Sequence, residues 1–456
     1  MKKLSLKETL FVASMLFGMF FGAGNLIFPA SMGQLSGSHM WTASIGFLIT
    51  GVGLPLLGVA ALGVSRKEGL LELSGGVGRR YGLFFTLALY LTIGPFFAIP
   101  RCATVSYTVG IQRILPAADQ TLVLAVFSLV FFAAVLFFSL RPGQILTWIG
   151  KILNPLFLCL LGILVIRALI SPMGNPLDIA PAGAYEGAAF STGLLEGYNT
   201  MDALAGLAFG IIVVNAIRNL GVKEPGEVAK QTVRAGIFSS LLMALIYVLV
   251  TLIGAQSRGI FEASSNGGEA LAQIAEHYFG RAGALILAGT VTVACLKTAV
   301  GLITSCGETF VRIFPKGPSY RFWAAAFCVL SFLIANLGLD AIIAYSMPVL
   351  MFLYPLAIVL ILLTLCGKFF RQDRTVLRWT IGFTSAAAVL DLLRALPEGT
   401  RNFLHLNGFL DQAAEILPLM RQGFGWVCPA LAGLAAGLLL HGRKNTAFLK
   451  GRKTSC

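Results

Sequence analysis

FFGAGNLIFP, residues 20–29, interrupts the first long apolar run of this 456-residue chain. Glycine costs about 1 kcal/mol relative to alanine inside a helix, so Gly22, Gly24 and Asn25 mark a place where a helix can open. At membrane depth an open backbone is tolerated only where it lines a cavity or is buried in protein. The motif therefore predicts either a ligand-binding interruption or close helix packing through small residues. Alone it does not decide between them.

STGLLEGYNTMDALA, residues 191–205, repeats this feature in the sixth apolar run. A charge at the centre of a bilayer costs at least about 2.5 kcal/mol, so Glu196 and Asp202 need a protein partner, an ion or water. The alternative is an interfacial loop between two shorter helices. Apolar sequence continues over 203–217, however, which favours an interruption within one span. Interruptions in the first and sixth helices, five helices apart, are typical of a five-plus-five inverted repeat. In such a fold the binding site lies between the two interrupted helices.

Composition places the whole chain in a membrane. It is 57% hydrophobic and 12% charged, about half the usual 25% of a soluble domain, and its mean hydropathy is +0.84. These values exclude a soluble enzyme, a disordered chain and a coiled coil, and the continuous apolar runs argue against an outer-membrane barrel. Twelve transmembrane helices are expected near 10–31, 41–64, 82–111, 121–140, 145–170, 189–217, 235–255, 281–310, 322–338, 341–366, 379–396 and 424–441.

We expect an all-α membrane protein with one integral-membrane domain over residues 1–442. Repeat one would cover about 8–170 and repeat two about 189–366. Two extra helices over about 379–441 and a basic cytoplasmic tail, 443–456, would follow. The stretch SSNGGEALAQIAEHYFG, between the seventh and eighth spans, predicts a short helix over the outer side.

Basic residues test this topology. With the N-terminus in the cytoplasm, 25 of the 34 Lys and Arg residues fall in inside segments, which is the bias expected of membrane proteins. Both termini should therefore be cytoplasmic. The net charge of +14 is explained by topology, and no nucleic-acid partner is expected.

Three basic residues lie within spans, Arg101, Arg167 and Lys297. Lys297 is about 24 Å along the eighth span from Arg281, so its ammonium needs anionic or carbonyl partners, unless it snorkels inward. Arg101, in the third span, either pairs with Glu196 or Asp202 or snorkels outward. No H-E-x-x-H motif and no phosphate-binding loop occur, so neither zinc-protease chemistry nor an ATP-driven pump is expected.

Four motifs in order carry a family resemblance: FGAGNLIFPASMG, GPFFAIPRCATVS, LEGYNTMDALAGLAFG and ACLKTAVGLITSCGETF. Over about residues 4–440 the chain resembles the branched-chain amino acid:cation symporters, which are the transport system II carriers of the amino acid–polyamine–cation superfamily. The resemblance implies a LeuT-like fold and import of leucine, isoleucine and valine. It also implies Na⁺ coupling, no cofactor besides the coupling ion, no required protein partner, and a bacterial plasma membrane location.

The resemblance also implies roles for residues. Backbone amides at Gly22, Ala23, Gly24 and Asn25 would hold the substrate carboxylate. The second opening would meet the amino group and side chain, through Glu196, Gly197, Tyr198, Asn199, Thr200 and Met201. Carbonyls of Gly18 and Phe21 would form half of a cation site, and the other half would lie near Ala294, Lys297 and Thr298. A Na⁺ ion would sit at Gly18, Phe21 and Thr298.

The chain departs from the expected pattern at two places. Sodium-coupled relatives commonly carry hydroxyls at two adjacent positions of the eighth span, whereas this chain has Lys297 and Thr298. Thr108 stands where an acidic residue is expected. An ammonium and Na⁺ cannot share one place cheaply, so H⁺ coupling through Lys297, or a fixed lysine charge without a coupling ion, competes with Na⁺ coupling.

Other function classes are weaker alternatives. An enzyme would need a nucleophile–histidine pair or a metal cluster at span depth, and the sequence has neither. A channel would need a ring of carboxylates in mid-span. The main competitor is a carrier of the same superfamily for another small amino acid or a nucleobase.

Overall fold

The computed structural model of the chain describes residues 3–22, 24–65, 67, 69–112, 119–141, 144, 146–370 and 372–453. Helices and their connections make up this part of the chain, and it contains no strand. The chain divides into two compact units, residues 1–59 with 90–343 and residues 60–89 with 344–456. Each unit is described by itself below.

The first unit holds both interruptions. Its α-helices, some continuing into the second unit, are α1 (Leu6–Phe20), α2 (Gly24–Ser36), α3 (Met40–Leu48), α4 (Leu54–Ser65), α6 (Arg79–Leu91), α7 (Ala98–Ser106), α9 (Gln120–Ser139), α10 (Asn154–Ile170), α11 (Tyr185–Asn199), α12 (Asp202–Asn219), α13 (Pro225–Ser257), α14 (Gly267–Phe279), α15 (Arg281–Ile313), α16 (Tyr320–Ala335) and α17 (Leu339–Leu365). Its 3₁₀ and π segments are η1 (Gly37–His39), η2 (Ile49–Gly53), η3 (Thr92–Phe96), η4 (Tyr107–Ile111), η6 (Leu146–Leu153) and η7 (Pro176–Asp178).

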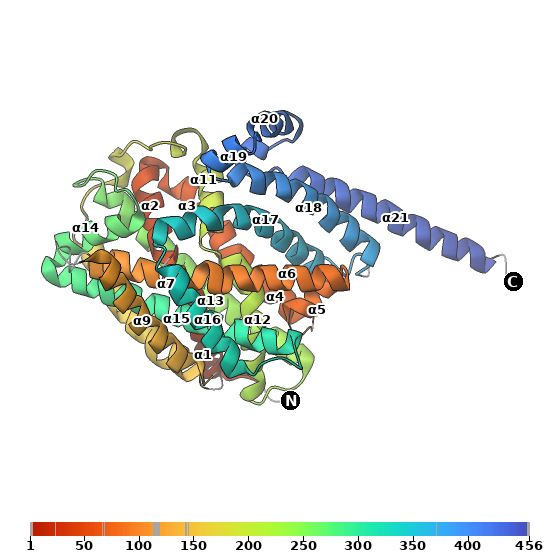
Figure 1. Ribbon diagram of the computed structural model, residues 1–456, viewed down its shortest axis with the longest axis horizontal. Helices are drawn as coiled ribbons and strands as arrows, with labels where there is room; N and C mark the ends of the chain where they lie inside the picture. Colours follow the sequence, from red (N-terminus) through yellow and green to blue (C-terminus); the bar gives the residue numbers. More distant parts are fainter. Residues whose placement is uncertain are drawn as a thin grey trace. The chain divides into compact units, whose positions relative to one another are not determined.

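The second unit is centred on two helices that pack side by side, α18 (Arg374–Ala395) and α21 (Val427–Lys453) (Figure 1). Close packing is possible because a Cβ atom at Gly433 would lie only 2.7 Å from the Trp379 carbonyl oxygen. The unit also contains α5 (Leu70–Gly75), α19 (Glu398–Phe403), α20 (Asn407–Ile416) and η8 (Met420–Gln422), with parts of α4, α6 and α17.

Within the described residues, nine helical stretches are long and apolar enough to cross a membrane, and two shorter apolar helices lie over 320–335 and 427–441. Each of the twelve predicted spans coincides with one or more of the observed helices. The chain is thus an all-helical, multi-pass membrane protein with about nine to eleven apolar helices, and the count of twelve crossings stays a prediction. The predicted short helix between the seventh and eighth spans is confirmed as α14.

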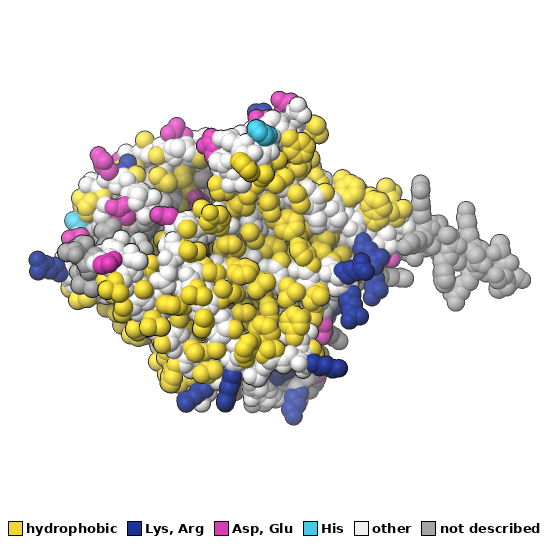
Figure 2. Space-filling model, viewed as in Figure 1, with side chains coloured by type: hydrophobic (Ala, Val, Ile, Leu, Met, Phe, Trp, Pro, Cys, Tyr) yellow, Lys and Arg dark blue, Asp and Glu magenta, His cyan; other side chains and the backbone are white. Residues whose placement is uncertain are grey.

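The outer face of α9 shows why these helices need lipid. Leu122, Val126, Leu129, Val130 and Phe137 are each more than half exposed. Figure 2 shows hydrophobic side chains gathered over the face that carries α9 and α16, with charged side chains at its margins. Large apolar patches on soluble monomers are rare, so this face is suited to contact acyl chains.

The first interruption follows from local chemistry. The α1 helix begins with a capping box, in which the Ser5 hydroxyl accepts from the Glu8 amide and the Glu8 carboxylate accepts from the Ser5 amide. It ends at Phe20, and α2 begins at Gly24. The Asn25 side-chain oxygen accepts a hydrogen bond from the Gly22 amide over 2.9 Å. Asparagine thus satisfies an amide that the helix no longer pairs.

The second interruption lies between α11 and α12, at Thr200 and Met201. Met201 adopts a left-handed backbone conformation with φ 63°, which is uncommon for a residue other than glycine. The Thr200 hydroxyl donates to the Gly197 carbonyl over 2.8 Å and accepts from the Asp202 amide over 3.3 Å. The sequence predicted both interruptions, and the helix bounds confirm them.

Candidate functional site

A small cavity lies between the two interruptions, and we call it the central cavity. Its volume is about 30 Å³, enough for one or two water molecules. Its walls come from both interrupted helices and from η3, α7 and α15. They are formed by Met19, Phe20, Gly22, Gly24, Asn25, Ile93, Ala98, Arg101, Cys102, Thr200, Met201, Asp202, Ala205, Thr298 and Leu302.

A buried hydrogen-bond network ties the two interruptions together. The Asn25 amide nitrogen donates to an oxygen of the Asp202 carboxylate, and the Tyr247 hydroxyl of α13 donates to the same oxygen over 2.8 Å. Asn25 also contacts the Tyr247 hydroxyl. Asp202 is 2% exposed, and a buried carboxylate of this kind is tolerated because hydrogen bonds compensate for lost hydration. One amide thereby links the first turns of α2 and α12.

Arg101 reaches the central cavity from α7. One terminal nitrogen of its guanidinium, Nη2, donates to the Asn199 carbonyl, at the end of α11, over 2.9 Å. Its guanidinium carbon lies 5.6 Å from the centre of the Phe28 ring, a cation–π contact. A Cβ atom at Gly24 would lie 2.9 Å from Nη2. The sequence left open whether Arg101 points inward or snorkels to the outer surface. The structure shows that it points inward, to the central cavity.

Lys297 is fully buried in α15. Its ammonium donates to the Asn154 side-chain oxygen over 3.1 Å and lies 3.7 Å from the centre of the Phe157 ring. The Asn154 amide donates onward to the Ser14 hydroxyl of α1 over 2.8 Å. The ammonium is thus held inside the protein by an amide oxygen and an aromatic face, and the inward snorkel does not occur.

Two predicted cation residues, Gly18 and Phe21, lie next to the partners of this lysine. Gly18 faces Asn154, because a Cβ atom at Gly18 would lie 3.6 Å from that side chain. The centroid of the Phe21 ring lies 5.3 Å from that of Phe157, with the two rings tilted by 43°. Ala294 is buried one helical turn before Lys297. The ammonium itself lies 5.5 Å from the centre of the Phe17 ring in the last turn of α1, whose end carries a partial negative charge.

Thr298 faces the first interruption instead. A Cβ atom at Gly22 would lie 3.0 Å from the Thr298 hydroxyl oxygen. This oxygen is buried and has no hydrogen-bond partner among the described residues. Thr298 also lines the central cavity, so the residue that follows Lys297 in the chain reaches this cavity.

Of the predicted substrate residues, Gly22, Gly24, Asn25, Thr200 and Met201 line the central cavity. Ala23 lies outside the described residues. The remaining four belong to the last turns of α11 and are absent from the lining: Glu196, Gly197, Tyr198 and Asn199.

These four residues have local roles. The Glu196 carboxylate accepts from the Asn199 side chain over 3.1 Å. Gly197 packs against η2, where a Cβ atom would lie 1.9 Å from the Thr50 hydroxyl oxygen. The Tyr198 side chain is 2% exposed. The opening of this span therefore begins later than predicted, at Thr200.

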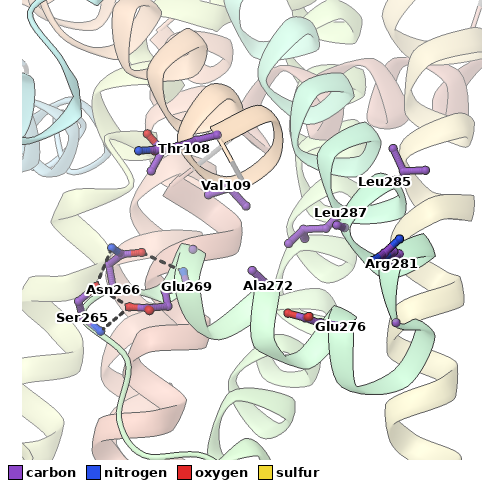
Figure 3. A pocket seen from close by; sticks show the side chains of 14 residues that line it. Thr108, Val109, Ser265, Asn266, Glu269, Ala272, Glu276, Arg281, Leu285 and Leu287 are labelled. Carbon is purple, nitrogen blue, oxygen red and sulfur yellow. Dashed lines mark hydrogen bonds between the residues drawn. The ribbon is translucent and has the colours of Figure 1, made fainter. Parts of the chain in front are cut away.

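A much larger cavity, of about 790 Å³, lies beside α14, and we call it the α14 cavity. Figure 3 shows Glu269 and Glu276 on α14, Arg281 at the start of α15, and Thr108 on η4 around it. Glu269 accepts from the Ser265 amide and hydroxyl. None of the predicted substrate or cation residues lines the α14 cavity, whereas Thr108, which stands where an acidic residue was expected, does.

Sequence reasoning missed two partners of the site, Asn154 and Tyr247. Tyr247 is one polar group in the long apolar run of α13, and nothing beside it marks a function. Asn154 precedes Pro155, and an Asn-Pro pair within an apolar run was the available signal. Neither residue's partner follows from spacing, because the contacts span 222 and 143 positions.

The arrangement is suited to binding and release. In the described part of the chain, no group of three or more His, Cys, Asp or Glu side chains could hold a metal ion. What converges on the central cavity is residues of two helix interruptions, one cationic side chain, one anionic side chain and an apolar wall.

Comparisons with known proteins agree with this description. The family model "Branched-chain amino acid transport protein" matches residues 5–444. Branched-chain amino acid permease BrnQ of Lactobacillus delbrueckii subsp. lactis is 53% identical over 429 residues, which cover 94% of this chain and 95% of the relative. Branched-chain amino acid permease BraB of Bacillus subtilis is 39% identical, with 96% of each chain covered.

Two solved structures share the fold. A closed, bromovinylhydantoin-bound structure of Mhp1, a nucleobase-cation-symport-1 family transporter, matches with a TM-score of 0.59 at 15% identity, covering 95% of this chain and 91% of that one. MhsT in complex with L-phenylalanine matches with a TM-score of 0.57 at 16% identity, covering 96% and 98%. The chain is therefore a transporter and not an enzyme, and it belongs to the branched-chain amino acid transport protein family.

Proposed function

We propose that the protein imports leucine, isoleucine and valine across a bacterial plasma membrane by alternating access. The observation that carries this proposal is the central cavity, where two helix interruptions meet next to an apolar wall of Met19, Phe20, Ile93 and Leu302. Interrupted helices at mid-membrane bind small charged ligands through their open backbone. The printed names of the relatives, which are branched-chain amino acid permeases, support the same substrates.

The apolar wall determines the expected selectivity. One methylene group changes binding in a hydrophobic pocket by only about 1–3 kcal/mol. Leucine, isoleucine and valine should therefore compete for the same place, and the alternative of a nucleobase should not. At about 30 Å³ the cavity has room for one or two waters, so an amino acid enters only when the cavity widens.

Coupling rests on Lys297. Its ammonium lies at Asn154 and Phe157 and beside Phe17 in the last turn of α1, next to the expected Na⁺ residue Gly18. Of the other expected Na⁺ residues, the Phe21 ring packs near Phe157, and Thr298 faces the central cavity. We propose that uptake is cation symport in which H⁺ carried by Lys297 replaces Na⁺ at this place. No other cofactor and no protein partner are needed, and both termini would be cytoplasmic.

Counterflow of labelled leucine in proteoliposomes tests the substrate. Vesicles loaded with unlabelled leucine, isoleucine or valine should accumulate the label, whereas uracil-loaded vesicles and vesicles without protein should not. Accumulation driven only by uracil, or by none of the three amino acids, would contradict the proposal.

The coupling ion is tested by uptake in choline and in sodium buffers, with external pH set between about 5.5 and 8.5 to vary the proton gradient (about one and a half units on each side of neutrality). Uptake in choline that rises with an inward proton gradient is the expected result. Strict dependence on Na⁺ that a proton gradient does not change would contradict H⁺ coupling and leave the substrate proposal standing.

A further inference from the structure

Two charged side chains of opposite sign line the central cavity. Among its described lining residues, Arg101 and Asp202 are the only charged ones. They are 6% and 2% exposed, and they attract each other electrostatically. Burying two charges is costly unless each has partners. Each has protein partners, described above, and each also lines a wall that otherwise consists of apolar and small polar groups.

Arg101 is placed to bind an anion. Its guanidinium stands at the first residue of α2, within 2.9 Å of the position that a Cβ atom at Gly24 would take. The start of a helix carries a partial positive charge and unpaired amides, so α2 and the guanidinium present positive charge to the same place. A guanidinium has five N–H donors in a planar fork that suits a carboxylate. The contact with Asn199 uses one of them.

Asp202 is placed to bind a cation. One of its carboxylate oxygens accepts from both Asn25 and Tyr247. These partners fix the orientation of the carboxylate at the cavity wall. A carboxylate held in this way can accept hydrogen bonds from an ammonium without reorganisation, which is the main advantage of a preorganised site.

We infer that Arg101 binds the carboxylate of the transported α-amino acid and that Asp202 binds its ammonium group. The zwitterion then lies along the axis between the two side chains, and its side chain points to Phe20, Ile93 and Leu302. This assignment rests on the proposed function and extends it. It explains why an α-amino acid is selected over a fatty acid or an amine of the same apolar shape.

The experiment pairs protein variants with ligand analogues. Purified protein is measured for competition against labelled leucine by leucine, leucinamide and 4-methylpentanoate. Leucinamide lacks the carboxylate, and 4-methylpentanoate lacks the ammonium. The variants are Arg101→Gln, Arg101→Lys and Asp202→Asn. Arg281→Gln is the matched control, because Arg281 is exposed at the α14 cavity.

Loss of a hydrogen bond to a charged group weakens binding about 10- to 100-fold. Arg101→Gln should weaken leucine binding by this factor and leucinamide binding by less than about threefold. Arg101→Lys keeps the charge, so its affinity for leucine should lie between those of the wild type and Arg101→Gln. Asp202→Asn should weaken the binding of leucine but change the binding of 4-methylpentanoate little. Arg281→Gln should bind all three ligands as the wild type does.

If both Arg101 variants lose affinity for leucine and for leucinamide equally, Arg101 has a structural role and the assignment is overturned. If Arg101→Gln does not fold, the Arg101→Lys series decides by the same criterion. Failure of the wild type to bind leucine would contradict the proposed function, which is a separate result.

Discussion

Two cavities of the first unit differ in size and in chemistry: the larger one is the α14 cavity, and the one with converging buried charges is the central cavity. The α14 cavity holds about 790 Å³ and is lined mainly by η4, α14 and the start of α15, whereas the central cavity holds about 30 Å³. Only the central cavity joins two interrupted helices, a buried guanidinium and a buried carboxylate. Size therefore identifies the more open region, and converging buried polar groups identify the site. Four changes test this difference.

Asn25→Ala should have the largest effect. It removes the acceptor for the Gly22 amide and the donor to Asp202. Leaving buried partners unsatisfied costs about 2–3 kcal/mol, or about 30- to 150-fold in leucine uptake. Initial uptake rates in proteoliposomes measure it. Asn407→Ala, at an exposed asparagine of α20, is the control. A loss of less than threefold would place the site outside the central cavity.

Lys297→Met should reduce uptake about tenfold and change its response to pH. Methionine keeps much of the apolar stem but removes the ammonium from Asn154 and Phe157, a contribution of about 1–2 kcal/mol. Residual uptake should no longer respond to a proton gradient. Lys316→Met, at an exposed lysine, should behave as the wild type. A proton response that survives in Lys297→Met would exclude this lysine as the carrier of H⁺.

Gly267→Ala tests the contact between α14 and the second half of the interrupted helix. A Cβ atom there would lie 1.7 Å from the Ile27 carbonyl oxygen, so α14 must shift away from α2. Overpacking of this kind costs about 1–3 kcal/mol. We expect a lower melting temperature and uptake reduced by a few-fold. Gly399→Ala has open space around it and should change neither. An unchanged melting temperature would mean that the two helices are not held in this contact.

Glu276→Gln should have the smallest effect. This residue lines the α14 cavity (Figure 3) and belongs to the exposed side of α14. Exposed charges contribute about 0–1 kcal/mol, so leucine uptake and its half-saturating concentration should change less than twofold. A change of tenfold or more would show that the larger cavity takes part in binding and would remove the contrast between the two.

How much of this could be predicted from the sequence depends on whether the signal is local. Gly22, Gly24 and Asn25 break a helix through their own backbone and side-chain preferences, so the first interruption was visible in ten residues. The depth of Lys297 followed from counting helical rise. The positions of the apolar spans followed from hydropathy in the same way.

The rest depends on contacts between distant segments. The Asn25–Tyr247 and Lys297–Asn154 pairs join helices separated by 222 and 143 positions, which periodicity does not encode. The start of the second interruption was expected from Glu196 onward, but α11 continues to Asn199. Gly197 there serves close packing against Thr50. A glycine in an apolar run has both uses, and only tertiary contacts distinguish them.

The single amide of Asn25 has a mechanical consequence. Its oxygen accepts from the Gly22 amide and its nitrogen donates to Asp202. If α2 or α12 tilted alone, at least one of these two hydrogen bonds would break. The two half-helices α2 and α12 are then expected to move together when the central cavity widens.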